Sequence, residues 1–142
     1  MTFILNQPFN KVTRPSGEVI YYPVIPIIFS KGNKKIPVGF ALVDTGADKT
    51  LLPLAFGNEF GFKFDLEADK EIWDGAGGGK FNVYKSPEKI KLTLTATGFP
   101  PLSKEMFVHF TLEQPTILIG RDFLNMFKTT FDGPRKTLKL EN

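Results

Sequence analysis

The chain has 142 residues, a length typical of a single domain that buries its own core, and 15 of them are phenylalanine. It contains no cysteine, which excludes disulfides, thiolate nucleophiles and cysteine metal sites but leaves the redox compartment open. The formal net charge is +3, yet the lysines are scattered in short clusters. Solvated surface charge accounts for such a pattern, so no nucleic acid partner is expected.

The N-terminal segment, residues 1–23, matches no pattern that predicts a role. Its apolar opening is short and is broken by Asn6, Gln7 and Pro8. The sequence has no run of about 18 apolar residues to span a membrane, and no basic segment followed by an apolar one to direct export. We therefore expect a cytoplasmic protein with no membrane partner.

From residue 24 onward, hydrophobic periodicity predicts a chain built mainly of β-strands. The β-branched residues 24–29 predict a strand, residues 31–35 a lysine-rich turn, and residues 36–43 the returning strand. Further along, residues 89–97 alternate between polar and apolar, which predicts a half-buried strand. Its inward side chains are expected to be Ile90, Leu92, Leu94 and Ala96. Residues 106–112 are expected to pair with it.

The C-terminal part contains the one helix that the pattern predicts, from Arg121 or Asp122 to about Phe127. Asp122 would then lie at the positive N-terminal end of this helix. A hairpin is expected to close the chain, with strands over residues 129–131 and 136–140 and a turn at 132–134. No repeat or linker divides the sequence, so residues 1–142 are expected to form one all-β domain.

The most informative segment follows the strand predicted over residues 36–43. It reads Ala-Leu-Val-Asp-Thr-Gly-Ala-Asp from Ala41 to Asp48. Apolar residues carry Asp44 toward a core, which is costly unless the carboxylate is hydrogen-bonded or its ionisation is altered. Gly46 and Ala47 let the backbone turn closely around it, and the Thr45 hydroxyl can bond neighbouring backbone groups. Asp44 is therefore the leading candidate for a functional residue.

Two more segments follow in order. The first is glycine-rich and reads Trp73-Asp74-Gly75-Ala76-Gly77-Gly78-Gly79-Lys80; the second reads Thr116-Ile117-Leu118-Ile119-Gly120-Arg121-Asp122-Phe123-Leu124. With the Asp-Thr-Gly loop, they resemble the retropepsins, the retroviral-type aspartic proteases, over residues 24–140. The resemblance implies a closed β-barrel of the acid-protease type with one short C-terminal helix. It also implies that residues 73–79, with Ala76 at the tip, form a flap over the substrate.

The residues present argue against several other kinds of site. A phosphate-binding loop would need glycine at Asp74 and a hydroxyl at Phe81, and a dinucleotide motif begun at Gly75 ends on Lys80. His109 is the only histidine, so no histidine cluster can hold zinc. No serine sits in a nucleophile elbow, so His109 is expected to be structural. Neither a metal nor a cofactor is expected.

The chemistry that remains is hydrolysis of a peptide bond by a pair of carboxylates. Two carboxylates about 3 Å apart share one proton, a behaviour for which aspartic proteases are the standard example. This sequence has a single Asp-Thr-Gly, and no other aspartate lies in an apolar-Asp-[Thr/Ser]-Gly context. Two chains must therefore supply one Asp44 each, in a symmetric homodimer acting on a polypeptide substrate.

The resemblance assigns further roles. It implies an ion pair between Asp48 and Arg121, a contact of Thr45 with the partner's loop, and contacts of Gly46 and Asp48 with the substrate backbone. Solvated charges at Asp48 and Arg121, and a glycine-rich surface turn without a catalytic part, are the plainer alternatives. An alternative function is a retropepsin-like dimerisation or peptide-binding module with little proteolytic activity. The intact Asp-Thr-Gly favours the aspartic endopeptidase.

Overall fold

A computed structural model describes residues 2–113 and 116–142 of the chain, so the beginning of the N-terminal segment, Met1, lies outside the described residues. The described part is mostly β-strand with two short α-helices, which confirms the predicted all-β class. The strands that build the main sheet are β4 (Val24–Lys31), β5 (Lys34–Val43), β6 (Leu51–Pro53), β7 (Glu71–Asp74), β8 (Lys80–Lys85), β9 (Ile90–Leu94), β10 (Leu102–Met106), β11 (His109–Thr111) and β12 (Leu118–Ile119).

The main sheet has the order β10-β9-β4-β5-β12-β6-β11-β8-β7. The predicted hairpin is its centre, because β4 and β5 pair antiparallel through a turn in which Gly32 has a positive φ of 57°. Strand β12 lies between β5 and β6, so the end of β5 and the segment before α2 (Arg121–Leu124) are side by side. The two outer strands, β10 and β7, are not paired with each other in the described residues, and closure into a barrel stays a prediction.

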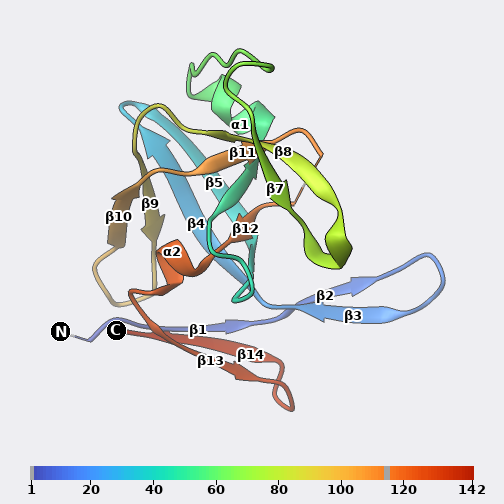
Figure 1. Cartoon of the computed structure of the whole chain (residues 1–142). Helices are drawn as coiled ribbons and strands as arrows, with labels where there is room; N and C mark the ends of the chain where they lie inside the picture. Colours follow the sequence, from blue (N-terminus) through green and yellow to red (C-terminus); the bar gives the residue numbers. More distant parts are fainter. Residues whose placement is uncertain (1, 114–115) are drawn as a thin grey trace.

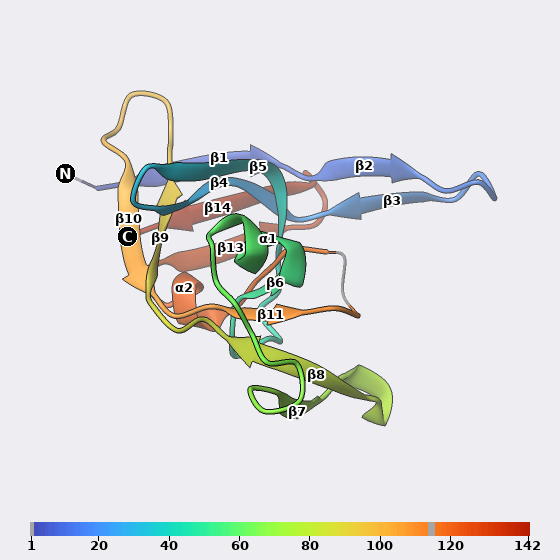
Figure 2. The ribbon, with the colours of Figure 1, turned by 90° about the horizontal axis from the view of Figure 1, so that it is seen from above.

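Two smaller sheets involve the chain ends. Strand β1 (Ile4–Pro8) pairs with β14 (Thr137–Glu141), which also pairs with β13 (Lys128–Asp132) in the predicted terminal hairpin. Strands β2 (Asn10–Thr13) and β3 (Val19–Tyr22) form a separate two-stranded ribbon, which projects from the body as an arm (Figures 1 and 2). The N-terminal segment therefore contains three strands that the sequence pattern did not reveal.

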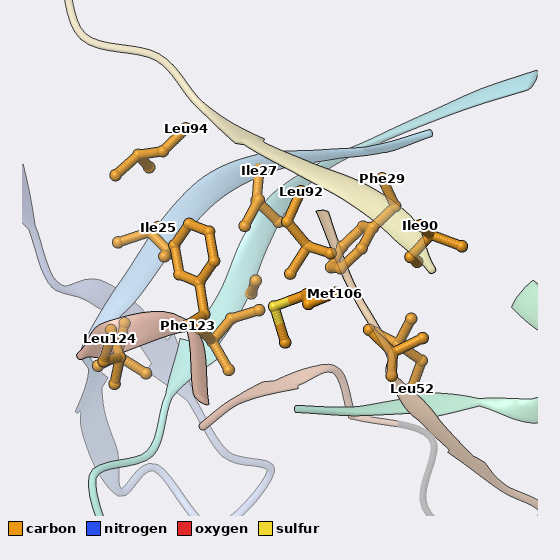
Figure 3. Packing of buried hydrophobic residues seen from close by; sticks show 14 of the residues in the cluster. Ile25, Ile27, Phe29, Leu52, Ile90, Leu92, Leu94, Met106, Phe123 and Leu124 are labelled. Atoms are coloured by element: carbon orange, nitrogen blue, oxygen red, sulfur yellow. The ribbon is translucent and has the colours of Figure 1, made fainter. Parts of the chain in front are cut away.

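The core lies between the main sheet and α2. Figure 3 shows Phe123 and Leu124 of α2 facing Ile25 and Ile27 of β4 and Leu92 of β9. Three of the predicted inward residues of β9, Ile90, Leu92 and Leu94, are almost fully buried. The strand ends at Leu94, and Ala96 is partly buried against the same core. This packing fixes α2 on the sheet and therefore fixes the residues on either side of it.

Three local predictions were wrong or incomplete. Of the predicted range 106–112, only Met106, the last residue of β10, pairs with β9; β10 is the partner of β9, while β11 runs parallel to β6 and antiparallel to β8. A second helix, α1 (Leu54–Glu59), was missed because Gly57 lowers the helix propensity of the segment. Gly57 is needed there, since a Cβ atom would lie 3.1 Å from the Phe64 ring. Helix α2 ends at Leu124 and not near Phe127.

No helix in the described ranges is both long and apolar enough to cross a membrane.

Candidate active site

The candidate catalytic loop leaves the main sheet at the end of β5. Asp44 follows Val43 directly, and its backbone N–H donates to the carbonyl oxygen of Ile119 in β12 at 3.0 Å. The loop then turns sharply, so that the N–H of Gly46 donates to the Asp44 carboxylate at 3.0 Å. A Cβ atom on Gly46 would lie 3.2 Å from that carboxylate, which explains the small residue there. The Asp44 side chain is half-buried and held by backbone groups.

A glycine and a buried threonine position the end of this loop. A Cβ atom on Gly120 would lie 2.6 Å from the carbonyl carbon and oxygen of Lys49, so only glycine lets α2 approach this closely. Thr50 is fully buried; its hydroxyl donates to one Asp122 carboxylate oxygen at 2.8 Å and its N–H to the other at 2.9 Å. The same hydroxyl accepts the Gly120 N–H at 3.2 Å. The Asp122 carboxylate also accepts from Phe123 N–H at 2.9 Å.

The first residues of α2 bind the loop through their backbone as well. The N–H of Arg121 donates to the Ala47 carbonyl at 2.9 Å, and the N–H of Asp122 donates to the Asp48 carbonyl at 3.2 Å. The Arg121 guanidinium donates to the Thr45 carbonyl at 2.8 Å and contacts the Asp48 carboxylate. The Arg121 and Asp48 side chains are 48% and 76% exposed, so solvent weakens their ion pair. The loop therefore depends mainly on buried and backbone contacts with α2.

The glycine-rich segment forms a hairpin. Strands β7 and β8 pair antiparallel from Glu71 opposite Val83 to Asp74 opposite Lys80. The tip is a short 3₁₀ turn over Ala76–Gly78, closed by a bond from the Gly75 N–H to the Gly79 carbonyl at 2.6 Å. Gly77 and Gly78 adopt positive φ values of 82° and 84°, the conformation that glycine favours, whereas Gly75 and Gly79 are extended. The tip is therefore built from local contacts.

Loop and hairpin enclose a cavity of about 660 Å³. Its lining combines the candidate loop with the base of the hairpin and is formed by Asp44, Gly46, Ala47, Asp48, Lys49, Leu51, Trp73, Asp74, Gly75, Phe81 and Leu118. The structure thus brings seven of the predicted site residues together: Asp44, Gly46, Ala47, Asp48, Trp73, Asp74 and Gly75. Thr45, Arg121 and the glycines 77–79 do not line it. Carboxylates set in a largely apolar cleft suit the binding and hydrolysis of a polypeptide segment.

His109 lies next to this cavity and packs against strand β7 of the hairpin. Its ring centroid is 4.7 Å from that of Trp73, and its Nε2 atom is 3.9 Å from a Glu71 carboxylate oxygen. Burial lowers the pKa of His109, and the attraction of Glu71 opposes that shift. No group of three or more acidic or histidine side chains among the described residues is arranged to hold a metal ion. The lowered pKa favours the neutral form of the His109 ring.

Comparison with known proteins identifies the family. The family model of the retroviral aspartyl protease matches residues 23–132. The chain belongs to the retroviral aspartyl protease family. Among solved structures, a retropepsin-like aspartic protease from Rickettsia conorii shares 21% identity, with a TM-score of 0.60, and the match covers 97% of this chain and 98% of that one. EIAV protease in complex with the inhibitor HBY-793 has 21% identity and a TM-score of 0.44, covering 81% and 93%. No curated protein sequence matches the chain.

Family membership accounts for the order of the three motifs, but several residues of the site went unnoticed in the sequence. Thr50 and Gly120 were not singled out, and Asp122 was read only as a favourable charge at a helix N-terminus. Lys49, Leu51, Phe81 and Leu118 also line the cavity. A buried threonine and a carboxylate 72 positions apart carry no local signal of their pairing. Only the Gly-Arg-Asp motif pointed to that end of α2.

Proposed function

We propose that this protein is a homodimeric aspartic endopeptidase in which Asp44 of each chain supplies one carboxylate of the catalytic pair. The observation that carries the proposal is the position of Asp44 at the cavity between the candidate loop and the hairpin. The cavity walls are mostly apolar, with Leu51, Phe81 and Leu118 on the two sides. An extended substrate with apolar side chains around the cleaved bond fits such walls.

Among the residues that the structure describes, no other carboxylate of the same chain is placed to pair with Asp44. Asp48 and Asp74 also line the cavity, but Asp48 contacts Arg121, and Asp74 contacts Lys80 at 2.6 Å. Asp122 has both oxygens bonded to Thr50. The second acid-base group must therefore be the Asp44 of another chain, related by a two-fold axis through the site.

Such a pair performs hydrolysis without a covalent intermediate. With one proton shared between the two carboxylates, the ionised one removes a proton from a bound water molecule while the protonated one donates to the peptide carbonyl oxygen. The water oxygen attacks the carbonyl carbon, and the resulting tetrahedral species breaks its C–N bond as the amine takes up a proton. The hairpin at residues 71–85 would cover the substrate and exclude water.

The chain ends limit how a partner can add to the small terminal sheet. We expect the terminal hairpin, residues 129–140, to contribute strands to a sheet shared between subunits. In the structure, β14 already has β1 and β13 of its own chain on its two sides. A shared sheet would therefore have to form at the β1 or β13 edge.

Subunit mixing tests the proposal. Asp44→Asn keeps the shape of the side chain but cannot act as an acid-base group, so the variant should fold and hydrolyse no peptide. When wild-type chains exchange with excess Asp44→Asn chains, most of them enter mixed dimers with one carboxylate. Peptide cleavage by the wild-type chains should then fall nearly to zero.

Asp69→Asn is the matched control, because the Asp69 carboxylate only accepts the Asp65 N–H in an exposed turn. Excess Asp69→Asn chains should leave cleavage unchanged or add to it. Full activity of a monomer, or full activity retained after demonstrated exchange with Asp44→Asn chains, would contradict the shared site. A dimer that binds peptides without cleaving them would instead identify a binding module.

A further inference from the structure

A second cavity, of about 510 Å³, lies next to the candidate active site. Residues from the hairpin, β10, β11 and α2 line it: Lys49, Glu71, Trp73, Lys85, Lys89, Lys104, Glu105, Met106, Phe107, His109 and Asp122. Lys49 and Trp73 line both cavities, whereas Asp44 lines only the first. The two cavities therefore adjoin at Lys49 and Trp73, and the second lies on the side away from Asp44.

Four lysines in this cavity have no carboxylate partner. No carboxylate oxygen lies within 4.0 Å of the ammonium nitrogens of Lys49, Lys85, Lys89 and Lys104 in the described residues. Other lysines of the chain do form such pairs, for example Lys34 with Glu59 at 2.8 Å. Four unpaired positive charges on one cavity repel each other and attract an anion.

Three acidic residues, Glu71, Glu105 and Asp122, also line the cavity, and the four lysines outnumber them by one. The Asp122 carboxylate is bonded to Thr50 and Phe123, and Lys104 donates to the Asp122 backbone carbonyl at 2.5 Å. Glu71 faces the ring of His109 at 3.9 Å. The ammonium groups of Lys85 and Lys89 lie over the Phe107 ring, at 4.5 and 5.8 Å from its centroid. An aromatic face holds these two cations together without cancelling their charge.

We propose that this lysine cavity binds an acidic side chain of the polypeptide substrate, at a position beyond the residues that flank the cleaved bond. The inference rests on the proposed endopeptidase function and adds to it a substrate preference for aspartate or glutamate. In the two-fold dimer each chain contributes one such cavity. The preference therefore applies on both sides of the cleaved bond.

The test compares peptides that differ only in charge. A peptide that the wild-type chain cleaves is taken from an unbiased library, and glutamate or glutamine is placed at successive positions on either side of its cleaved bond. At one or more of these positions the kcat/KM of the glutamate peptide should exceed that of the glutamine peptide by a factor on the order of five. This is the size of effect expected from a charge contact near a protein surface. The ratio should fall toward 1 as salt is added.

Lys85→Gln combined with Lys89→Gln should bring the ratio of the two peptides close to 1. Lys63→Gln combined with Lys91→Gln is the matched control, because it removes the same charge from exposed lysines that do not line the cavity. The control should keep the wild-type ratio. Cleavage without any preference for glutamate, or a preference that survives the Lys85 and Lys89 changes, would overturn the inference while leaving the protease intact.

A binding measurement keeps the inference testable if no peptide is cleaved. Trp73 is the only tryptophan of the chain and lines both cavities, so its fluorescence reports occupancy directly. An apolar peptide that carries one glutamate should change this fluorescence at a lower concentration than the same peptide with glutamine in its place, and the difference should vanish in the Lys85 and Lys89 variant. An oligonucleotide that binds as tightly as the acidic peptide, with the same dependence on Lys85 and Lys89, would overturn the assignment to a peptide.

Discussion

The candidate catalytic loop and the flap hairpin line the same cavity but are held in different ways. Residues 44–50 are fixed by contacts with β12 and α2, which lie about 70 positions later in the sequence. The tip of the hairpin is held by its own turn, and a Cβ atom on Gly77 or Gly78 would have no neighbour within 4 Å. One wall of the site is therefore part of the folded core, and the other is a local structure that can move.

This difference predicts where substitutions damage the fold and where they change only the site. Changes at the junction of the loop with α2 should lower global stability, because they disturb buried contacts. Changes at the tip of the hairpin, residues 75–79, should leave stability nearly unaltered, because opening the tip exposes little of the core. Because we propose that the protein is a dimer, the free energies of unfolding should all be measured at the same chain concentration.

The largest effect is expected for Gly120→Ala. Its methyl group would lie 2.6 Å from the Lys49 backbone, which cannot move away without displacing the candidate loop. We expect a loss of about 3 kcal/mol in the free energy of unfolding, measured by urea denaturation. Gly39→Ala is the control, since a Cβ atom there meets nothing within 4 Å. Equal stability of the two variants would show that the loop is not fixed by this close approach.

Thr50→Val should have a smaller but clear effect. Valine keeps the shape of the side chain but removes a hydroxyl that bonds both Asp122 and Gly120. The buried Gly120 N–H then loses its partner, and the Asp122 carboxylate keeps only the backbone N–H groups of Thr50 and Phe123. The expected cost is about 2 kcal/mol, again read from urea denaturation. Thr93→Val removes an exposed hydroxyl contact with Ser103 and should cost less than about 0.5 kcal/mol. A Thr50→Val variant as stable as wild type would contradict the role given to this pair.

The smallest effects are expected for the two exposed ion pairs, one on each wall. Double-mutant cycles to alanine should give a coupling of about 1 kcal/mol or less for Arg121 with Asp48, and less still for Lys80 with Asp74. Arg121 should show the larger value because its guanidinium also binds the Thr45 carbonyl. Arg121→Lys should lose most of the coupling with Asp48, because lysine lacks the planar guanidinium group that can donate several hydrogen bonds at once. A larger coupling in the hairpin pair would reverse the comparison between the walls.

Much of the fold was predictable from local pattern. The hairpin β4–β5, the half-buried β9 and the terminal hairpin β13–β14 have the alternation and turns that decide a strand without help from the rest of the chain. The pairing of residues 106–112 was not predictable in this way. Alternation shows which face of a strand is buried but does not name its neighbour, and β11 finds its partners in β6 and β8.

The candidate site also has features that the local sequence pattern predicts and features that it does not predict. The sequence by itself indicated the family through three motifs in order, and it pointed to Asp44 because apolar residues carry this carboxylate toward a core. It also located the glycine-rich hairpin, since positive φ at two successive positions requires glycine.

The tertiary structure alone decided what surrounds these motifs. The pairing of Thr50 with Asp122, the approach of Gly120 to Lys49, and the gathering of four lysines on one cavity each join residues that are far apart in the chain. Such contacts leave no periodic trace in a single sequence, because they depend on how the strands stack and not on the pattern within any one of them.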